Sequence, residues 1–203
     1  MLPCPCVNSA ISAETMNEPT GPKHKRDALA TRARILEAAQ QAFSETGYSH
    51  TGIREIARLA ETSSTLLLRY FGSKAGLFEA ALREAMPASQ TLDWGREAYA
   101  ARLADVLLEP ANPVRPPLMI ALASGDVEAA AIAARVSEER AIDPLANWLG
   151  GERARERALA IAMAATGFVT YARQLPIDRL SAEEIDGLKA WFVRTVDALV
   201  KGD

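Results

Sequence analysis

The sequence has few cysteines and histidines, and this shortage excludes several kinds of chemistry. Its two cysteines, Cys4 and Cys6, lie one residue apart with no further cysteine nearby, so they provide neither a disulfide framework nor a structural zinc site. Its two histidines, His24 and His50, have no partners at metal-ligand spacing, and no phosphate-loop motif occurs. We therefore expect no metal, no cofactor and no catalytic residues, and a protein that is not an enzyme.

Long hydrophobic runs are also absent. The longest uncharged stretch, Ala158–Ala172, has 15 residues, fewer than the roughly 18–20 that a membrane-spanning helix needs. The first residues have neither the positive segment nor the apolar segment of a secretory signal. Aromatic residues make up only 6% of the chain, against 49% hydrophobic and 24% charged residues, so the core relies on aliphatic side chains. We expect a globular cytoplasmic protein without a membrane partner.

Charge is distributed unevenly along the 203 residues. The formal net charge is −3, yet residues 22–74 contain 9 Lys and Arg against 5 Asp and Glu, a net charge of +4. Residues 87–203 contain 13 against 17, a net charge of −4. A basic segment on an acidic chain is compatible with nucleic-acid binding, and it is equally compatible with a solvated surface unless a motif supports the first interpretation.

Apolar residues recur at helical spacing throughout, and no segment alternates with a period of two, so the pattern predicts an all-α protein. We expect a flexible arm over 1–22, a helix-turn-helix domain over 23–86 with a linking helix from 74, and a helical bundle over 87–203. Helices are expected over about 27–46, 51–61, 64–71, 74–86, 92–108, 118–123, 127–141, 143–148, 152–174 and 182–201. Predicted N-caps are Thr51, Ser63, Ser73, Asp126, Asp143 and Ser181, the last in a capping box with Glu184, and Gly47 is predicted to end the first helix.

Residues 51–74 combine an amphipathic helix, a tight turn and a short second helix, which is a helix-turn-helix pattern. In such a pair the second helix can enter the major groove, about 12 Å wide, and present its first residues to base edges. Helix pairs with short turns also occur in many bundles that bind no DNA. Spacing alone therefore leaves both interpretations open.

The region from Arg34 to Met86 resembles the DNA-binding domain of the TetR family of bacterial transcriptional regulators, over about a quarter of the chain. The motifs that carry the resemblance are ILEAAQQAFSETGY, then IREIARLA, and above all RYFGSKAGLF. A later stretch, TGFVTYARQLPIDRLSAEEIDGL, resembles the last two helices of many members. The resemblance implies an N-terminal DNA-binding domain and a C-terminal domain for ligand binding and dimerisation.

Residue by residue, the resemblance implies phosphate contacts from Thr51, Ser63, Tyr70 and Lys74. Hydroxyl groups and a lysine near helix N-termini suit this role. Thr51 and Ser63 can also serve as caps, and Tyr70 can instead belong to the core. Leu68 and Thr65 depart from the family pattern, which more often has tyrosine and glycine at those positions.

Base recognition falls to the first turns of the second helix and to one arginine. A hydroxyl accepts varied partners, leucine can contact a thymine methyl group, and Arg69 can grip guanine with two hydrogen bonds or contact phosphate instead. The candidate base-contacting residues are Ser64, Thr65, Leu66 and Arg69. Lys25 and Arg26, in the basic run that begins at Lys23, add phosphate or minor-groove contacts or lie solvated.

The same resemblance implies a small-molecule pocket within the C-terminal helices and a dimer interface on the last two. Apolar, aromatic and a few polar residues are candidates for the pocket, which suggests an apolar or aromatic effector, although any one of them can simply be packed. Pocket candidates are Trp94, Tyr99, Leu103, Met119, Leu122, Asn147, Trp148, Met163, Thr166, Phe168, Thr170, Tyr171 and Gln174. Interface candidates, which can equally form an intramolecular core, are Ile185, Leu188, Phe192, Val196 and Leu199.

The sequence thus predicts a homodimeric, ligand-responsive regulator that binds a palindromic operator in double-stranded DNA, most simply as a repressor. The alternative is a helical protein that binds a small molecule or a partner without specific DNA binding.

Overall fold

Helices make up most of the chain that the computed structural model describes, namely residues 22–86, 91–113, 115–175 and 180–202, and these ranges contain no β-strand. The predicted all-α class is confirmed. Side chains are described from Arg26 onward. The predicted arm up to residue 21, the side chain of Lys25 and Pro87 lie outside the described residues. None of the described helices combines the length and low charge that crossing a bilayer requires.

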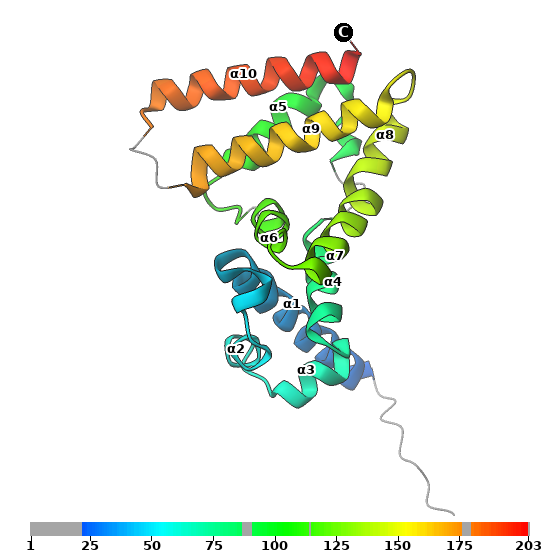
Figure 1. The fold of residues 1–203 in the computed structure, drawn as a ribbon, viewed down its shortest axis with the longest axis vertical. Coiled ribbons are helices and arrows are strands. Elements are labelled where there is room, and N and C mark those ends of the chain that lie inside the picture. Colours follow the sequence, from blue (N-terminus) through cyan, green and yellow to red (C-terminus); the bar gives the residue numbers. More distant parts are fainter. Residues whose placement is uncertain (1–21, 87–90, 114, 176–179, 203) are drawn as a thin grey trace, which may run out of the picture.

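The helices form two groups with two more helices between them (Figure 1). The lower group contains α1 (Pro22–His50), α2 (Ile53–Leu59), α3 (Ser64–Phe71) and α4 (Lys74–Ala85). The upper group contains η1 (Leu92–Trp94), α5 (Arg96–Leu108), α8 (Asp143–Leu149), α9 (Ala154–Val169), η3 (Thr170–Gln174) and α10 (Ala182–Lys201). Helices α6 (Arg115–Ala123) and α7 (Val127–Ser137) join the groups, and the π-helical turn η2 (Glu138–Ile142) follows α7.

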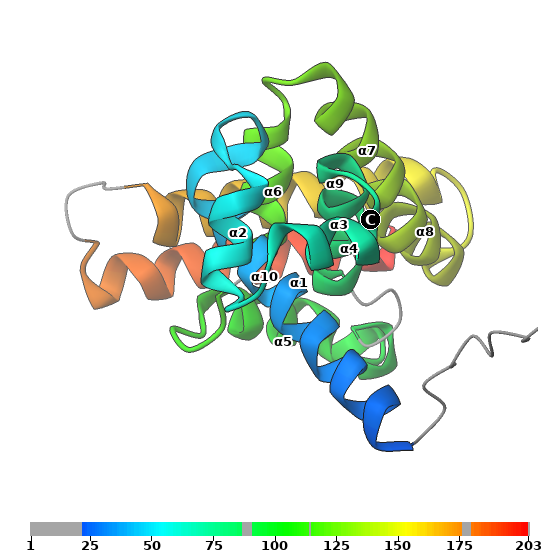
Figure 2. The same ribbon diagram turned by 90° about the horizontal axis from the view of Figure 1, so that it is seen from below.

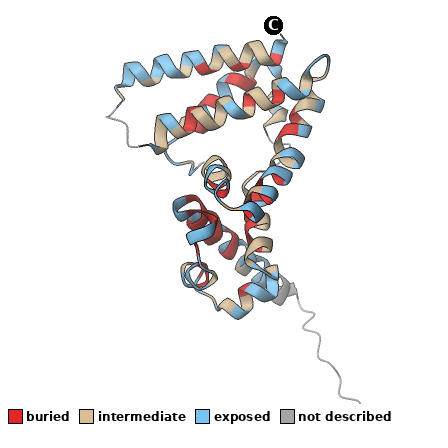
Figure 3. Cartoon of the chain, in the orientation of Figure 1, coloured by how far each residue is buried: buried red, intermediate tan, exposed pale blue. Residues whose placement is uncertain are grey.

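The lower core forms where the apolar face of α1 packs on that of α4 (Figure 3). Phe78 of α4 meets Phe43 edge to face, with ring centroids 5.1 Å apart, and lies 5.3 Å from the ring of Tyr48. Burying a Leu or Phe side chain contributes about 1.5–3 kcal/mol. The main buried residues of this contact are Ile35, Leu36, Ala39, Phe43, Leu77, Phe78, Ala81 and Leu82.

Helices α6 and α7 extend this lower core. Met119 and Ala123 of α6, and Ile132 and Val136 of α7, are buried in the same cluster as α1 and α4. Helices α5, α8, α9 and α10 enclose a second cluster, in which Phe168 and Phe192 stack with ring centroids 4.5 Å apart. The core around α4 therefore includes helices that follow residue 87.

Most predicted helix ends are confirmed. Ser63, Ser73 and Asp126 each accept a backbone hydrogen bond at the start of a helix, and Ser181 forms the predicted capping box with Glu184. The prediction for Thr51 is wrong, because Gly52 occupies the cap position of α2 and makes no side-chain hydrogen bond there. Lys23 to Arg26 belong to the start of α1 rather than to an arm, since that helix begins at Pro22.

Two of the longer predicted helices have different boundaries. The helix expected over 92–108 is interrupted at Gly95, which has a φ of 76°, and only Arg96–Leu108 is α-helical. Asp143 does not cap a new helix, because the chain stays helical from α7 through η2 into α8. The wider π turn comes just before Pro144, which has no backbone N–H to continue a regular helix.

The predicted interface stripe on α10 is partly wrong. Phe192 and Val196 have no exposed surface and pack within the upper core. Leu199 is half-buried against the same core, and Ile185 is also half-buried. Leu188 alone of the stripe is exposed. The helical spacing therefore reflects intramolecular packing against α5 and α9 for most of these residues.

Gly47 generates a testable prediction about stability. It has a φ of 78° and a ψ of 168°, a region that only glycine adopts easily, and a Cβ there would lie 3.2 Å from the Cβ of Leu122. Gly47→Ala should lower the free energy of unfolding by about 1–3 kcal/mol in urea titrations. Gly52→Ala is the matched control, because Gly52 has a φ of −99° and open space around it. Equal losses from both variants would contradict the conformational explanation.

Candidate nucleic-acid interface

Helix α3 lies at the end of the molecule farthest from α10, and the view from below shows it in front of the other helices (Figure 2). It is held in place by Leu67, which is fully buried, and by the Ser63 Oγ, which accepts a hydrogen bond from the Leu66 N–H at 3.1 Å. Glu61 adopts a φ of 49° in the turn after α2. One side of α3 is thus anchored while the rest remains accessible.

The accessible side carries the predicted base-contacting residues. Thr65 and Arg69 are exposed, and Ser64 and Leu66 are half-buried. Within the described part of the chain, Arg69 has no ion-pair partner, so its guanidinium has donors to offer. Leu68 is also exposed, at 41%. The geometry brings these side chains together on one surface.

Tyr70 lies at the edge of this surface and not in the core. The residue is 37% exposed, and its hydroxyl donates a long hydrogen bond of 3.5 Å to the Ala28 carbonyl of α1. Arg32 of α1 lies 5.7 Å from the ring of the neighbouring Phe71. The start of α1 therefore flanks α3, and Arg26 is exposed on that same segment.

Thr51 has a structural position instead of the predicted place at the surface. It is 1% exposed, and its hydroxyl donates to the Gly47 carbonyl at 2.6 Å and contacts the Thr46 hydroxyl at 2.7 Å. The prediction of a phosphate contact from this side chain is therefore corrected. The hydroxyl stabilises the bend between α1 and α2.

Lys74 connects the surface to the core. Its ammonium lies 4.3 Å from the centroid of the Tyr48 ring, an attractive cation–π geometry. The Tyr48 hydroxyl in turn donates to Glu128 of α7 at 2.7 Å. Burial and this hydrogen bond raise the pKa of Tyr48, which stays protonated at neutral pH. Lys74 is half-buried at the N-terminus of α4.

Sequence reasoning did not single out three exposed arginines on the two helices that flank α3, Arg32 on α1 and Arg54 and Arg58 on α2. Their polar helix positions are a weak signal, because such residues are solvated in most helices. Within the described ranges, no group of His, Cys, Asp and Glu side chains has the arrangement of a metal site.

A cavity of about 230 Å³ lies among α5, α6, η2 and α9, away from α3. Its wall is mostly apolar, and the described part includes Tyr99, Leu103 and Thr166, three of the predicted pocket residues. Ser137 and Arg140 also line it. These two were missed, although Ser137, Ala141 and Leu145 recur at one-turn spacing and share the face of a helix.

Comparison with known proteins gives matches over both halves of the chain. The description "Bacterial regulatory proteins, tetR family" matches residues 35–81, and "Tetracyclin repressor-like, C-terminal domain" matches residues 97–200. The chain belongs to the TetR family.

Individual proteins are similar to this chain over different lengths, RutR in sequence and two solved structures in fold. The transcriptional regulator RutR of Escherichia coli is 44% identical over 62 residues, which are 30% of this chain and 29% of RutR. A TetR-family regulator from Rhodococcus sp. has a TM-score of 0.65 at 16% identity, covering 84% of this chain and 98% of its own. NalD, the secondary repressor of an efflux pump in Pseudomonas aeruginosa, has a TM-score of 0.60 at 18% identity, covering 83% and 96%.

The TetR fold places most of the other predicted pocket residues away from this cavity. Met119 and Phe168 are buried in the two cores, and Leu122 packs beside Gly47. Trp94 and Trp148 flank the Tyr99 ring at 6.2 and 5.2 Å without lining the cavity. The remaining predicted residues are outside the cavity wall, and they are Asn147, Met163, Thr170, Tyr171 and Gln174.

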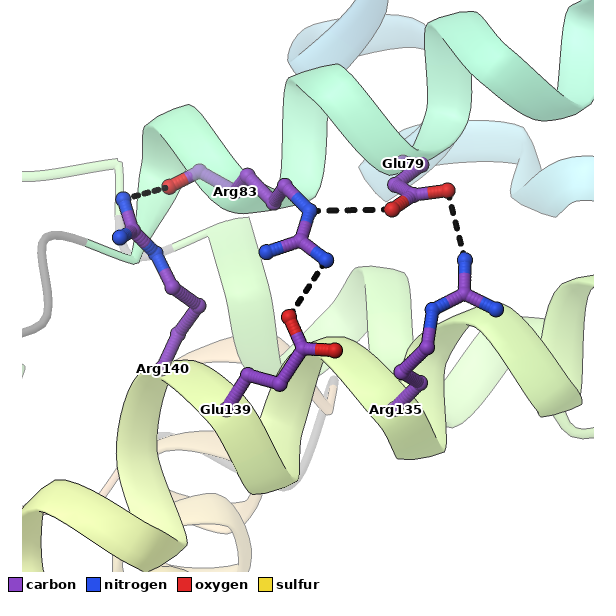
Figure 4. A network of polar contacts seen from close by, with 5 residues as sticks. All are labelled: Glu79, Arg83, Arg135, Glu139 and Arg140. Carbon is purple, nitrogen blue, oxygen red and sulfur yellow. Dashed lines mark hydrogen bonds and ion pairs between the residues drawn. The ribbon is translucent and has the colours of Figure 1, made fainter.

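A polar network joins the cavity side of the molecule to α4 (Figure 4). Arg83 of α4 pairs with Glu139 at 2.5 Å and with Glu79 at 3.0 Å, and these hydrogen bonds raise the pKa of Arg83. Arg135 of α7 pairs with Glu79 at 2.6 Å. Arg140 donates to the Arg83 carbonyl at 3.4 Å. These side chains are partly exposed, so each pair contributes about 0.2–1 kcal/mol and can rearrange.

Substitutions of Thr51 and Thr65 test whether a buried threonine hydroxyl contributes more to stability than an exposed one. Thr51→Val should lower the free energy of unfolding by about 1 kcal/mol, because it removes the hydrogen bonds of the buried hydroxyl with the Gly47 carbonyl and the Thr46 hydroxyl. Thr65→Val, on the exposed side of α3, should change it by less than about 0.5 kcal/mol. Chemical denaturation followed by circular dichroism measures both. A stable Thr51→Val variant would show that its hydroxyl has no structural role.

Proposed function

We propose that this protein is a transcriptional regulator that binds a palindromic operator as a homodimer, acts as a repressor and is released by a small molecule. The observation that carries the proposal is the exposed surface of α3, with Thr65 and Arg69 on its accessible side and Leu67 as its buried anchor. The cytoplasmic location expected from the sequence belongs to this proposal, because the operator is genomic DNA.

In the proposed complex α3 enters the major groove. Thr65 and Arg69 contact base edges, with Ser64 and Leu66 beside them, as their positions on α3 allow. The exposed hydroxyl of Ser63 and that of Tyr70 lie where phosphate contacts are expected. Lys74 adds positive charge at the N-terminus of α4.

Dimerisation is proposed through an apolar face on α9, η3 and α10. Met163 is 72% exposed, Tyr171 62% and Trp191 47%, and Leu188 lies beside them in the same groove. Gly167 also lines this groove, and its lack of a side chain would let another helix approach closely. Large exposed apolar patches mark interaction sites. This face replaces the predicted stripe, of which it retains Leu188.

Release by a small molecule is proposed to act through η2. Arg140 and Ile142 of this turn line the cavity, while Glu139 and Arg140 contact Arg83 of α4. Helix α4 directly follows α3, so a ligand that shifts η2 would also shift the orientation of α3 in each subunit. The ligand would lower DNA affinity by a factor set by how much more tightly it binds the shifted arrangement than the arrangement that fits the operator.

Titration of DNA from the gene's own upstream region tests operator binding. In gel-shift assays we expect a specific complex that weakens steeply as salt rises, because phosphate contacts release counterions. Arg69→Ala should weaken the specific complex by about 1–3 kcal/mol and flatten sequence preference, whereas Lys74→Ala should weaken all sequences alike. Glu97→Ala, at an exposed position of α5 in the upper group of helices, is the control without effect. No specific shift would favour the alternative of a helical binding protein without operator recognition.

Sedimentation of charge variants tests the dimer face. Trp191→Glu should convert dimers to monomers, because a carboxylate would be buried without a partner at the apolar interface. Val127→Glu is the control, since Val127 is 91% exposed at the start of α7. Circular dichroism verifies that both variants are folded. A dimer that survives Trp191→Glu would refute this face as the interface.

A further inference from the structure

The cavity wall contains one charged residue among the described residues that form it, and this residue is Arg140. The rest is largely aliphatic or aromatic, including Tyr99, Leu103, Ile142 and Ile161. Two of these, Tyr99 and Ile161, are at most 4% exposed. A guanidinium in such surroundings loses much of its hydration and requires compensation from nearby acceptors.

The described residues offer Arg140 few hydrogen-bond acceptors. The Nε of Arg140 and the Oγ of Ser137 are both buried, and neither has a hydrogen-bond partner among the described residues. The hydrogen bond from Arg140 to the Arg83 carbonyl is long, at 3.4 Å. The adjacent carboxylates are engaged elsewhere, Glu139 by Arg83 and Glu138 by Arg155 at 2.6 Å. Arg140 therefore carries hydrogen-bonding capacity and positive charge that its neighbours leave unmatched.

We propose that the cavity binds an organic anion, with an aliphatic or aromatic body among the apolar residues and one carboxylate held by Arg140 and Ser137. A carboxylate suits this pair, because it accepts hydrogen bonds from a guanidinium and a hydroxyl together. This inference rests on the proposed function in one respect only, namely that the ligand of this cavity is the effector that releases the protein from DNA.

Other ligand classes fit the wall less well. A cation would face the charge of Arg140 in a site of low polarity. A fully apolar ligand would leave the Arg140 Nε and the Ser137 hydroxyl unpaired, so it would gain only apolar contacts and none of the hydrogen bonds that a carboxylate gains. Tyr99 adds no negative charge that would repel an anion, because burial raises its pKa to about 12 and the phenol stays neutral.

Matched probes test the charge preference by isothermal titration calorimetry on the full chain without DNA. The probes are benzoate, 4-phenylbutyrate, octanoate and decanoate, each beside its primary amide, with 4-phenylbutylamine as the cation. We expect at least one carboxylate to bind about tenfold or more tightly than its amide and the amine to bind least. Equal binding of acid and amide, tighter binding of the amine, or no binding by any carboxylate would overturn the proposal.

Variants locate the bound anion. Arg140→Gln should remove the preference for the acid over the amide while a thermal melt confirms folding, and Arg140→Lys should restore part of it. Arg194→Gln is the matched control, because it removes the same charge from an exposed position on α10, which provides no residue of the cavity wall. Ala165→Phe should abolish binding of acid and amide alike by filling the cavity. An unchanged acid preference in Arg140→Gln would overturn the assignment even if carboxylates bind.

Gel shifts with the same probes separate this inference from the proposed function. Carboxylate binding that depends on Arg140, in a protein that shifts no DNA, would support the cavity assignment and refute the regulator. Specific DNA binding in a protein whose cavity shows no preference for the acid over the amide would support the regulator and refute the cavity assignment.

Discussion

The structure depends above all on helix α4 being packed on two sides. Its apolar face, with Leu77 and Phe78 fully buried, fixes it to α1 and so sets where α3 lies. Its polar face meets α7 and η2 through Glu79 and Arg83. The first contact is apolar and close-packed, and shifting it would open cavities. The second combines partly exposed ion pairs, each contributing about 0.2–1 kcal/mol, with the apolar residues of α7 that belong to the lower core.

This difference would let a rigid lower core coexist with the ligand-responsive connection that we propose. The edge-to-face contact of Phe43 with Phe78 keeps α1 and α4 together as one body. The Tyr48 hydroxyl, bonded to Glu128, extends that body to the start of α7. The other end of α7 is built differently, because η2 replaces regular helix there and Pro144 lacks a backbone donor, and we place the proposed movement at this end.

Local sequence signals predicted the elements well, because they act within a few residues. Ser63, Ser73, Asp126 and Ser181 cap the helices that they precede, and the spacing of Ile35, Leu36, Ala39 and Phe43 gives the buried face of α1. Helix α3 lies at the end of the molecule farthest from α10, which agrees with the DNA-binding role that the TetR-like motifs around it imply.

The sequence did not predict in the same way whether a given helix face points to the core, to the cavity or to the surface. Phe192 and Val196 have the spacing of an interface and of a core alike, and only the positions of α5 and α9 decide between them. Thr51 fits both a cap and a phosphate contact by residue type, but the bend at Gly47 turns its hydroxyl inward. Arg140 lies in a charged stretch typical of solvated helix, and a neighbouring helix places it at the cavity.

Arg140 also connects the cavity to α4, the helix that directly follows α3. The Arg83 carbonyl that it contacts belongs to the last turn of α4, where carbonyl groups lack helical partners and attract cations. An anion in the cavity would compete with that carbonyl for the same guanidinium. Because the contact is long and Met86 also donates to this carbonyl at 3.3 Å, Arg140 can be redirected without leaving the helix end unpaired. Ligand charge, rather than ligand size alone, would then determine how firmly α4 is held against η2.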